Sequence, residues 1–213
     1  MRKKPSLTAD QRGLFRLVRQ TIGTNPFTAE RQRLDRELAG AGATPEARLA
    51  RAIRRVGESV AGLAAAGGGD ATRYDGEDRE LVRAVLLFHL FHEYMARFDV
   101  HIQAQEGAGH GAVTVEFADE CLGRLRRGGF GAEEASRALA MFFQLRRAFH
   151  FIHTGLAGAS RCMQELRVQL WNNVFTHDFL TYERLLWNRL EDFSTLLLGE
   201  TGTGKGTAAA AIG

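Results

Sequence analysis

The sequence predicts a mainly α-helical protein, in which a bundle of helices over residues 1–154 precedes a short helix–strand–loop–helix segment over residues 155–213. Three observations predict this fold class. The chain has only three prolines in 213 residues, and β-branched residues are sparse beside Leu, Ala and Arg, which favours helices. Apolar residues recur at helical spacing along most of the chain. Near the C-terminus a leucine-rich run, a glycine-rich loop and an alanine-rich stretch follow one another.

Composition and charge exclude several classes of protein. Hydrophobic residues at 45% and charged residues at 25% are typical of a globular chain. The net charge of +3 is too small to indicate nucleic-acid binding by bulk electrostatics. No stretch of about 20 uninterrupted apolar residues occurs, so we expect no membrane span. Cys121 and Cys162 have no paired spacing, which indicates a reducing, cytoplasmic compartment.

Caps and breakers predict the first three helices. Thr8 can cap a helix that is broken at Asn25-Pro26. Thr28 begins a second, strongly charged helix. Thr44, followed by a proline and a glutamate, begins a third, which we expect to run to about Ala65 and to end at the glycines that follow.

The third helix carries a cluster of arginines, at Arg48, Arg51, Arg54 and Arg55. Contact with nucleic acid is one interpretation of such a cluster. Arg is also a good helix former and is abundant throughout this chain, so a solvated helix face is the favoured interpretation.

The middle of the chain predicts a central helix with shorter neighbours. From Glu77 the apolar residues occur all the way round the helix, as in a helix that is buried on most sides. We expect it to fray or bend near residues 103–111. An amphipathic helix over Val113–Arg127 and another that opens at Gly131 complete a bundle of roughly five or six helices.

Two pairs of histidines are spaced three residues apart, namely His89 with His92 and His150 with His153. Residues three apart lie on one face of a helix, so two such pairs that meet could hold Zn²⁺ or a di-iron centre. The di-iron pattern requires Glu-x-x-His, which neither pair provides. Partly buried histidines with backbone or carboxylate partners are therefore the favoured interpretation.

The C-terminal stretch has the residues of a phosphate-binding loop. Residues 194–198 predict a buried strand, and the pattern Gly199-x-x-x-x-Gly204-Lys205 follows at once. Glycines permit the backbone N–H groups to turn inward around a phosphate, and the lysine and the next helix N-terminus add positive charge. The predicted nucleotide-binding residues are Gly199, Glu200, Thr201, Gly202, Thr203, Gly204, Lys205, Gly206 and Thr207.

ATP is the cofactor that this loop predicts, whereas Mg²⁺ is doubtful. Gly206 occupies the position at which Ser or Thr normally holds the metal, and Thr207 lies one residue late. A glycine-rich turn that binds nothing is the alternative. The remaining parts of an ATPase domain cannot fit into the eight residues after Lys205. We therefore expect the front of a longer protein, which does not hydrolyse ATP as it stands.

Four segments after Gly155 resemble one known family. Residues 156–164 are similar to its opening motif, an apolar pair followed by Gly-x-Ser-x-x-Met, and residues 195–205 are similar to its Walker A strand and loop. Residues 170–178, with the aromatic-rich stretch 182–187, resemble an element found in one branch. The family is that of the sigma-54-dependent transcriptional activators, or bacterial enhancer-binding proteins, whose central domain is an AAA+ ATPase. The resemblance covers roughly the last 60 residues.

The resemblance implies a modular regulator. Residues 155–213 would be the truncated start of an AAA+ α/β domain, and residues 1–154 the helical control domain. The full-length protein would assemble as a homo-oligomer, use ATP to remodel sigma-54 RNA polymerase, and hold DNA through a C-terminal domain that is missing here. Two departures stand out: Gly206 replaces the family's usual glutamate, and the spacing from Gly158 to Gly199 is longer than in the common activators.

Two other functions remain open. One is a helical protein-interaction module whose degenerate P-loop has a structural role, which Gly206 favours. The other is a different AAA+ ATPase, such as a clamp loader or a protease-linked unfoldase. The reading frame beyond Gly213 would discriminate among them, because a Walker B acidic pair and a sigma-contacting loop define the regulator.

Overall fold

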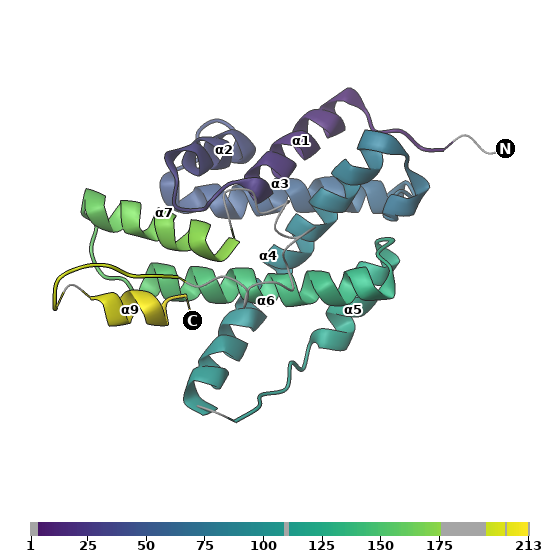
Figure 1. Ribbon diagram of the computed structural model, residues 1–213. Helices are drawn as coiled ribbons and strands as arrows, with labels where there is room; N and C mark the ends of the chain where they lie inside the picture. Colours follow the sequence, from purple (N-terminus) through teal and green to yellow (C-terminus); the bar gives the residue numbers. More distant parts are fainter. Residues whose placement is uncertain (1–3, 109–110, 176–194, 203, 213) are drawn as a thin grey trace.

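The computed structural model describes residues 4–108, 111–175, 195–202 and 204–212. Eight α-helices and one 3₁₀-helix form the regular structure of these residues, and no β-strand occurs among them (Figure 1). The mainly α prediction is therefore confirmed. In chain order the elements are α1 (Ala9–Gly23), α2 (Ala29–Ala39), α3 (Pro45–Ala65), η1 (Ala71–Arg73), α4 (Gly76–Ala108), α5 (Ala118–Arg127), α6 (Ala132–Thr154), α7 (Arg161–Phe175) and α9 (Lys205–Ala210).

Threonine caps begin the first three helices, as the sequence predicts. The backbone N–H of Gln11 donates to the Thr8 hydroxyl (3.2 Å), and the Thr8 N–H donates to the Gln11 side chain (2.9 Å). Thr28 and Thr44 accept from the third residue of α2 and α3 in the same way. Each cap gives a partner to a backbone donor that would otherwise lack one, which explains why these boundaries are readable from local sequence.

Helix α4 is the central element of the bundle, and it packs against α1, α3, α5 and α6. Its buried residues surround the helix and include Leu81, Val85 and Phe98. At its start, the Asp78 carboxylate accepts two hydrogen bonds from Arg12 (2.6 and 2.8 Å) and one from the Leu7 N–H (3.0 Å). These contacts tie the N-terminal segment to α4.

None of the described helices combines the length and the apolar character needed to cross a bilayer.

One helix boundary differs from that predicted. Helix α4 ends at Ala108, within the stretch 103–111 where we expected it to fray or bend, whereas α5 begins at Ala118 instead of Val113. The residue before α5 explains this difference. Phe117 is buried, with its ring centroid 5.7 Å from that of Tyr94 and 4.9 Å from that of Phe98. Packing of this ring against α4 determines where the chain can enter the helix, which an amphipathic pattern alone does not reveal.

The apolar core consists of two clusters that share α6. The first cluster joins α1, α3, α4 and α5 to the N-terminal half of α6. The second joins the C-terminal half of α6 to α7, Leu156 and α9. In Figure 1, α6 runs across the middle of the molecule, with α7 and α9 along one end of it. The shared helix makes the two clusters neighbours in one continuous bundle.

A polar contact joins α7 to the turn between α1 and α2. The Asn25 side-chain amide donates to the Val168 carbonyl (3.1 Å) and to the Asn172 side chain (2.9 Å), while its oxygen accepts from the Phe27 N–H (2.9 Å). The Phe27 ring stacks on Phe149 of α6. Contacts thus cross the predicted boundary after residue 154, and the division into two domains stays a prediction.

The strand predicted before the glycine loop is not present among the described residues. Residues 195–200 have no regular secondary structure, and Leu196 and Leu198 are 80% and 84% exposed. The expectation of a strand buried on both faces was therefore wrong for Thr195–Leu198, and Ser194 lies outside the described residues. A strand requires a neighbour to complete its hydrogen bonds, and the described chain supplies none.

The turn between α5 and α6 depends on one glycine. Gly129 has φ +89°, a conformation that favours glycine. A Cβ atom at this position would lie 2.3 Å from the Asp70 carboxylate. Asp70 caps η1 by accepting from the Thr72 N–H (2.8 Å), and the Ala71 N–H donates to the Gly128 carbonyl (3.0 Å). The turn and η1 are held together at this point.

Candidate phosphate-binding loop

The predicted loop curves through two glycines and then enters a helix. Gly202 and Gly204 have φ of 84° and 83°, so both adopt the left-handed conformation that the glycine pattern predicts. Helix α9 begins directly at Lys205, and its first hydrogen bond runs from the Ala208 N–H to the Gly204 carbonyl (3.0 Å). Thr203 lies outside the described residues. The local order of loop and helix therefore follows the sequence, whereas the preceding strand does not.

The Lys205 side chain folds back over its own loop. Its ammonium donates to the Gly199 carbonyl (2.8 Å) and to the Glu200 carbonyl (2.6 Å). The first glycine and the lysine of the pattern are therefore in contact. Carbonyl oxygens carry only partial negative charges, so a phosphate oxygen would be a stronger acceptor for the same ammonium.

The positions after the lysine do not fit a magnesium ion. Gly206 has no side chain, and the space where its Cβ would lie is open within 4 Å. Thr207 is exposed, but one further residue on a helix turns the side chain by about 100° away from the position that normally holds the metal. The loop thus lacks the usual hydroxyl ligand for Mg²⁺.

Helix α9 is anchored by its alanines. Ala208 and Ala211 are buried at 6% and 4% exposure in the second cluster, whereas Ala209 and Ala210 are exposed. Leu197 and Ile212 are partly buried against the same cluster. The second apolar cluster thus holds α9 in place, which the sequence did not indicate.

The residues of the predicted opening motif come together at the start of α7. The Met163 N–H donates to the Ser160 hydroxyl (3.4 Å), and Gly158 has φ 110° with Met163 close to where a Cβ would lie. Arg167 closes this segment by donating to the carbonyls of Leu156 (2.5 Å) and Gly158 (2.8 Å). The glycine, serine and methionine therefore have a local structural role in one turn.

The histidine pairs have structural partners. The His92 Nδ1–H donates to the Phe88 carbonyl (2.9 Å), and burial lowers the pKa of His92 to about 4. Burial also lowers the pKa of His89, whose ring lies 3.5 Å from the Glu93 carboxylate. His150 lies 3.8 Å from Glu106. Within the described parts of the chain, no group of three or more potential ligands could hold a metal ion.

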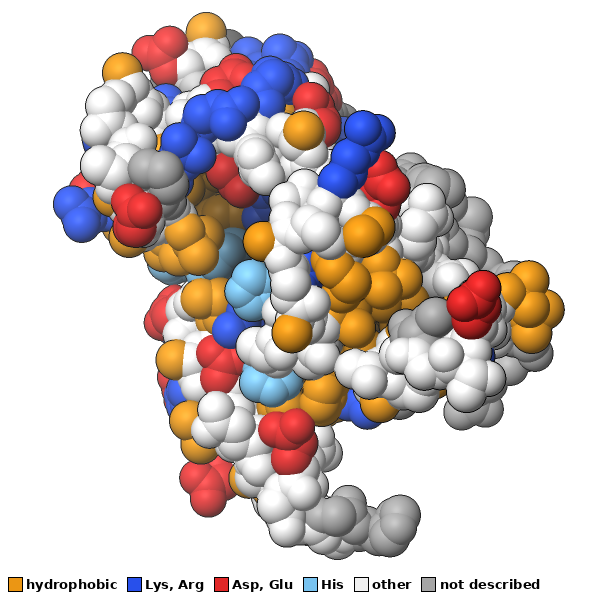
Figure 2. All heavy atoms as spheres, turned by 90° about the vertical axis from the view of Figure 1, so that its left-hand side faces the viewer, with side chains coloured by type: hydrophobic (Ala, Val, Ile, Leu, Met, Phe, Trp, Pro, Cys, Tyr) orange, Lys and Arg blue, Asp and Glu red, His pale blue; other side chains and the backbone are white. Residues whose placement is uncertain are grey.

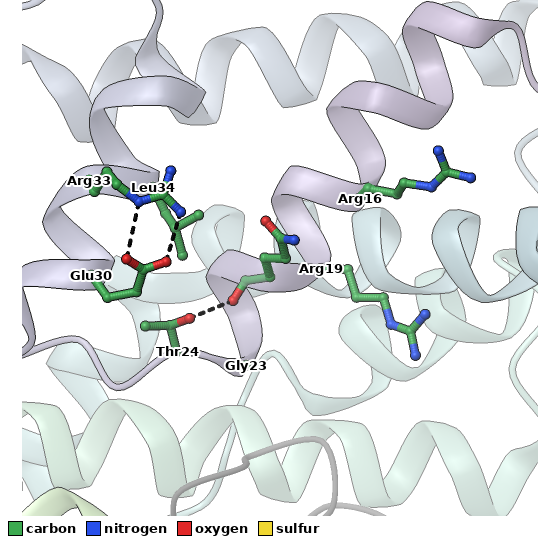
Figure 3. A pocket seen from close by; sticks show the side chains of 8 residues that line it. Arg16, Arg19, Gly23, Thr24, Glu30, Arg33 and Leu34 are labelled. Atoms are coloured by element: carbon green, nitrogen blue, oxygen red, sulfur yellow. Dashed lines mark hydrogen bonds and ion pairs between the residues drawn. The ribbon is translucent and has the colours of Figure 1, made fainter.

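One hollow lies outside the predicted site, between α1 and α2 (Figure 3). It has a volume of about 530 Å³, and its lining includes Arg16, Arg19, Arg33 and Glu30. Arg33 is paired with Glu30 (2.7 Å), and Arg16 is paired with Glu77 of α4 (2.7 Å). Most of its charge is therefore already balanced. In the sequence, the arginines of α1 indicate a positively charged surface here, but they do not reveal that Glu77 and Glu30 balance part of the charge.

Comparison of the chain with protein-family models, curated proteins and solved structures finds no significant match.

Proposed function

We propose that the chain is part of an ATP-binding transcriptional regulator of the sigma-54-dependent type, with its nucleotide site at residues 199–207. One observation carries the proposal: the Lys205 ammonium lies against the carbonyls of Gly199 and Glu200. The lysine and the first glycine of the pattern thus face each other across the loop. Left-handed Gly202 and Gly204 lie between them in the sequence, which supports the proposal because glycines in this conformation allow backbone N–H groups to turn toward a phosphate.

The nucleotide supplies the anion, and the chain supplies the donors. Lys205 would exchange its carbonyl partners for the β- or γ-phosphate, and the N–H groups that open α9 would add their partial positive charge. Gly206 offers no oxygen for Mg²⁺, so this part of the proposal is restricted to nucleotide binding. Hydrolysis by the described chain is not part of it.

The partners of the proposed regulator are carried by the resemblance of the last 60 residues. Residues 1–154 would form the control domain and residues 155–213 the start of the AAA+ domain. The remaining partners are sigma-54 RNA polymerase, further copies of the same subunit, and DNA bound through a separate C-terminal domain. This reasoning is by analogy with a family and applies to the longer protein.

A second candidate function is a helical interaction module in which the loop has only a structural role. The burial of Ala208 and Ala211 favours it, because α9 then serves as an apolar cover for α6 and α7. Gly206 favours it as well, since the residue removes the metal ligand. In this case the two hydrogen bonds from Lys205 to the carbonyls would serve only to hold the loop in its conformation.

Nucleotide titration tests the first candidate against the second. We expect the Lys205→Ala variant to lose at least about tenfold in ATP affinity, measured by isothermal titration calorimetry, because a charged hydrogen bond contributes about 1.5–3 kcal/mol. Lys4→Ala is the matched control, since Lys4 is an exposed lysine that pairs with Asp75 far from the loop in sequence. Equal ATP affinity of Lys205→Ala and the parent would contradict nucleotide binding by this loop and would leave a structural role of the loop as the remaining candidate.

The polymerase part of the proposal has its own test. A longer version of the protein that continues beyond Gly213 should bind sigma-54 RNA polymerase in an ATP-dependent manner, measured by native gel shift. Binding of ATP without any binding of the polymerase would support a different AAA+ protein instead.

A further inference from the structure

Five arginines without carboxylate partners gather where α2 meets α3. Arg36 lies in the last turn of α2, and Arg48, Arg51, Arg54 and Arg55 lie on α3. Among the residues that the structure describes, none of the five forms an ion pair, although arginines of α1, α4, α5 and α6 do so with Asp or Glu. On α3 the four arginines outnumber the acidic residues, Glu46 and Glu58, and form no ion pair with either of them, so this face has an excess of positive charge.

Two of these arginines are held in place by the end of α2. Arg51 donates to the Ala41 carbonyl (3.2 Å), and Arg55 donates to the carbonyls of Glu37 (3.4 Å) and Leu38 (3.0 Å). A guanidinium has five N–H groups, so each of the two keeps donors for another acceptor. Arg48, Arg51 and Arg55 share one face of α3, and seven residues of helix span about 10 Å. The result is a short, fixed row of donors.

A hollow lies at the start of this row. Its volume is about 330 Å³, and it is lined by Arg36, Glu37, Arg48 and the turn 40–43. The Nε atom of Arg48 is enclosed and has no acceptor within the described structure. The Glu37 carboxylate does not compensate it, because that group pairs with Arg33 (3.0 Å). Figure 2 shows Lys and Arg side chains, with Asp and Glu side chains among them, over the upper part of one side of the molecule.

We propose that the α2–α3 face binds the phosphate backbone of double-stranded nucleic acid, with one phosphate at the hollow and its neighbours along α3. Arginine recognises phosphate through paired N–H groups, and a row on a rigid helix suits a rigid series of charges. Helices α2 and α3 contain no Phe, Tyr, Trp or His. A surface without rings has no platform on which single-stranded bases stack, so the duplex is the form that fits.

The binding is independent of sequence and weak at high salt. On this proposal the arginines contact backbone phosphates, and phosphates carry no base identity. The face also belongs to the first apolar cluster, whereas the glycine loop packs on the second. It therefore functions whether or not the loop binds ATP.

The test compares two triple variants of equal charge. The patch variant carries Arg36→Gln, Arg48→Gln and Arg54→Gln, none of which donates a side-chain hydrogen bond within the described structure. The control variant carries Arg19→Gln, Arg126→Gln and Arg127→Gln, which are exposed arginines without ion pairs among the described residues. Binding to a fluorescein-labelled DNA duplex of about two helical turns is measured by fluorescence anisotropy, and circular dichroism checks that both variants are folded.

We expect the patch variant to weaken duplex binding at least about tenfold at about 50 mM salt, and to reduce the salt slope by about one for each phosphate contact that is lost. The control variant should retain the affinity of the parent to within about threefold. Three results would overturn the proposal: no binding by the parent, an equal loss in the control variant, or tighter binding of poly-glutamate than of the duplex at the same arginines. The last would identify an acidic polypeptide as the partner.

Discussion

At the scale of single residues, His92 shows how the fold controls a titratable group. Its ring packs 4.1 Å from Phe88 and 5.1 Å from Phe91, measured between centroids. Burial is the main cause that lowers its pKa to about 4, with further lowering by the charges of Arg31 and Arg146. The hydrogen bond to Phe88 acts in the opposite direction. The imidazole is thus neutral in the folded protein at physiological pH.

The lowered pKa of His92 predicts a loss of stability in mild acid. Above pH 6.5 the ring is neutral in both the folded and the unfolded chain. Between pH 6.5 and about 4 only the unfolded chain takes up the proton, so the free energy of unfolding should fall by up to about 3 kcal/mol. Urea unfolding at several pH values measures this. His92→Phe should flatten the dependence, whereas His153→Gln should not. A His92 ring that titrates near 6.5 by NMR would contradict the assignment.

At the scale of elements, α9 depends on two small residues. Ala208 and Ala211 are buried against α6 and α7, while Ala209 faces solvent. A carboxylate at a buried position must be desolvated, which is costly without a partner. We expect Ala208→Asp or Ala211→Asp to release α9, so that trypsin cleaves after Lys205 several times faster than in the parent. Ala209→Asp is the matched control. Equal cleavage rates in all variants would show that α9 is not held by these alanines.

At the scale of the whole molecule, the shared helix α6 predicts cooperative unfolding. Trp171 lies in the second cluster, whereas the far-ultraviolet signal comes from every helix. In a Trp187→Phe background, thermal unfolding followed by Trp171 fluorescence and by circular dichroism should give one midpoint. Leu125→Ala in the first cluster should lower the midpoint by the same amount in both signals, because the substitution reduces the free energy of unfolding by about 2–5 kcal/mol. An earlier fluorescence transition would mean that α7 unfolds separately.

Local signals predicted much of this fold, and non-local ones explain the rest. Thr8, Thr28 and Thr44 act on backbone groups within three residues, so the helix starts could be read from the sequence. The lack of a strand at residues 195–198 could not be read from the sequence, because a strand is completed by partners elsewhere in the chain. The docking of α7 through Asn25 is of the same kind, since its partners lie more than 140 residues away.

In the candidate site, too, the local features could be predicted from the sequence and the non-local ones could not. The left-handed Gly202 and Gly204 and the helix that begins at Lys205 follow from the glycine spacing. The burial of Ala208 in the second apolar cluster does not follow from that spacing, because nothing within the loop specifies the surface against which it packs. The same limit applies to the arginines of α3, since their lack of carboxylate partners becomes visible only once every helix is in position.

Gly129 has a consequence for how this protein can vary over evolutionary time. A methyl group there would collide with the carboxylate of Asp70, which caps η1. A substitution of Gly129 therefore requires a change at Asp70 as well. Gly13, on the open side of α1 with no atom near its missing Cβ, is free to become alanine at any time. The two glycines thus differ in how freely they can be substituted.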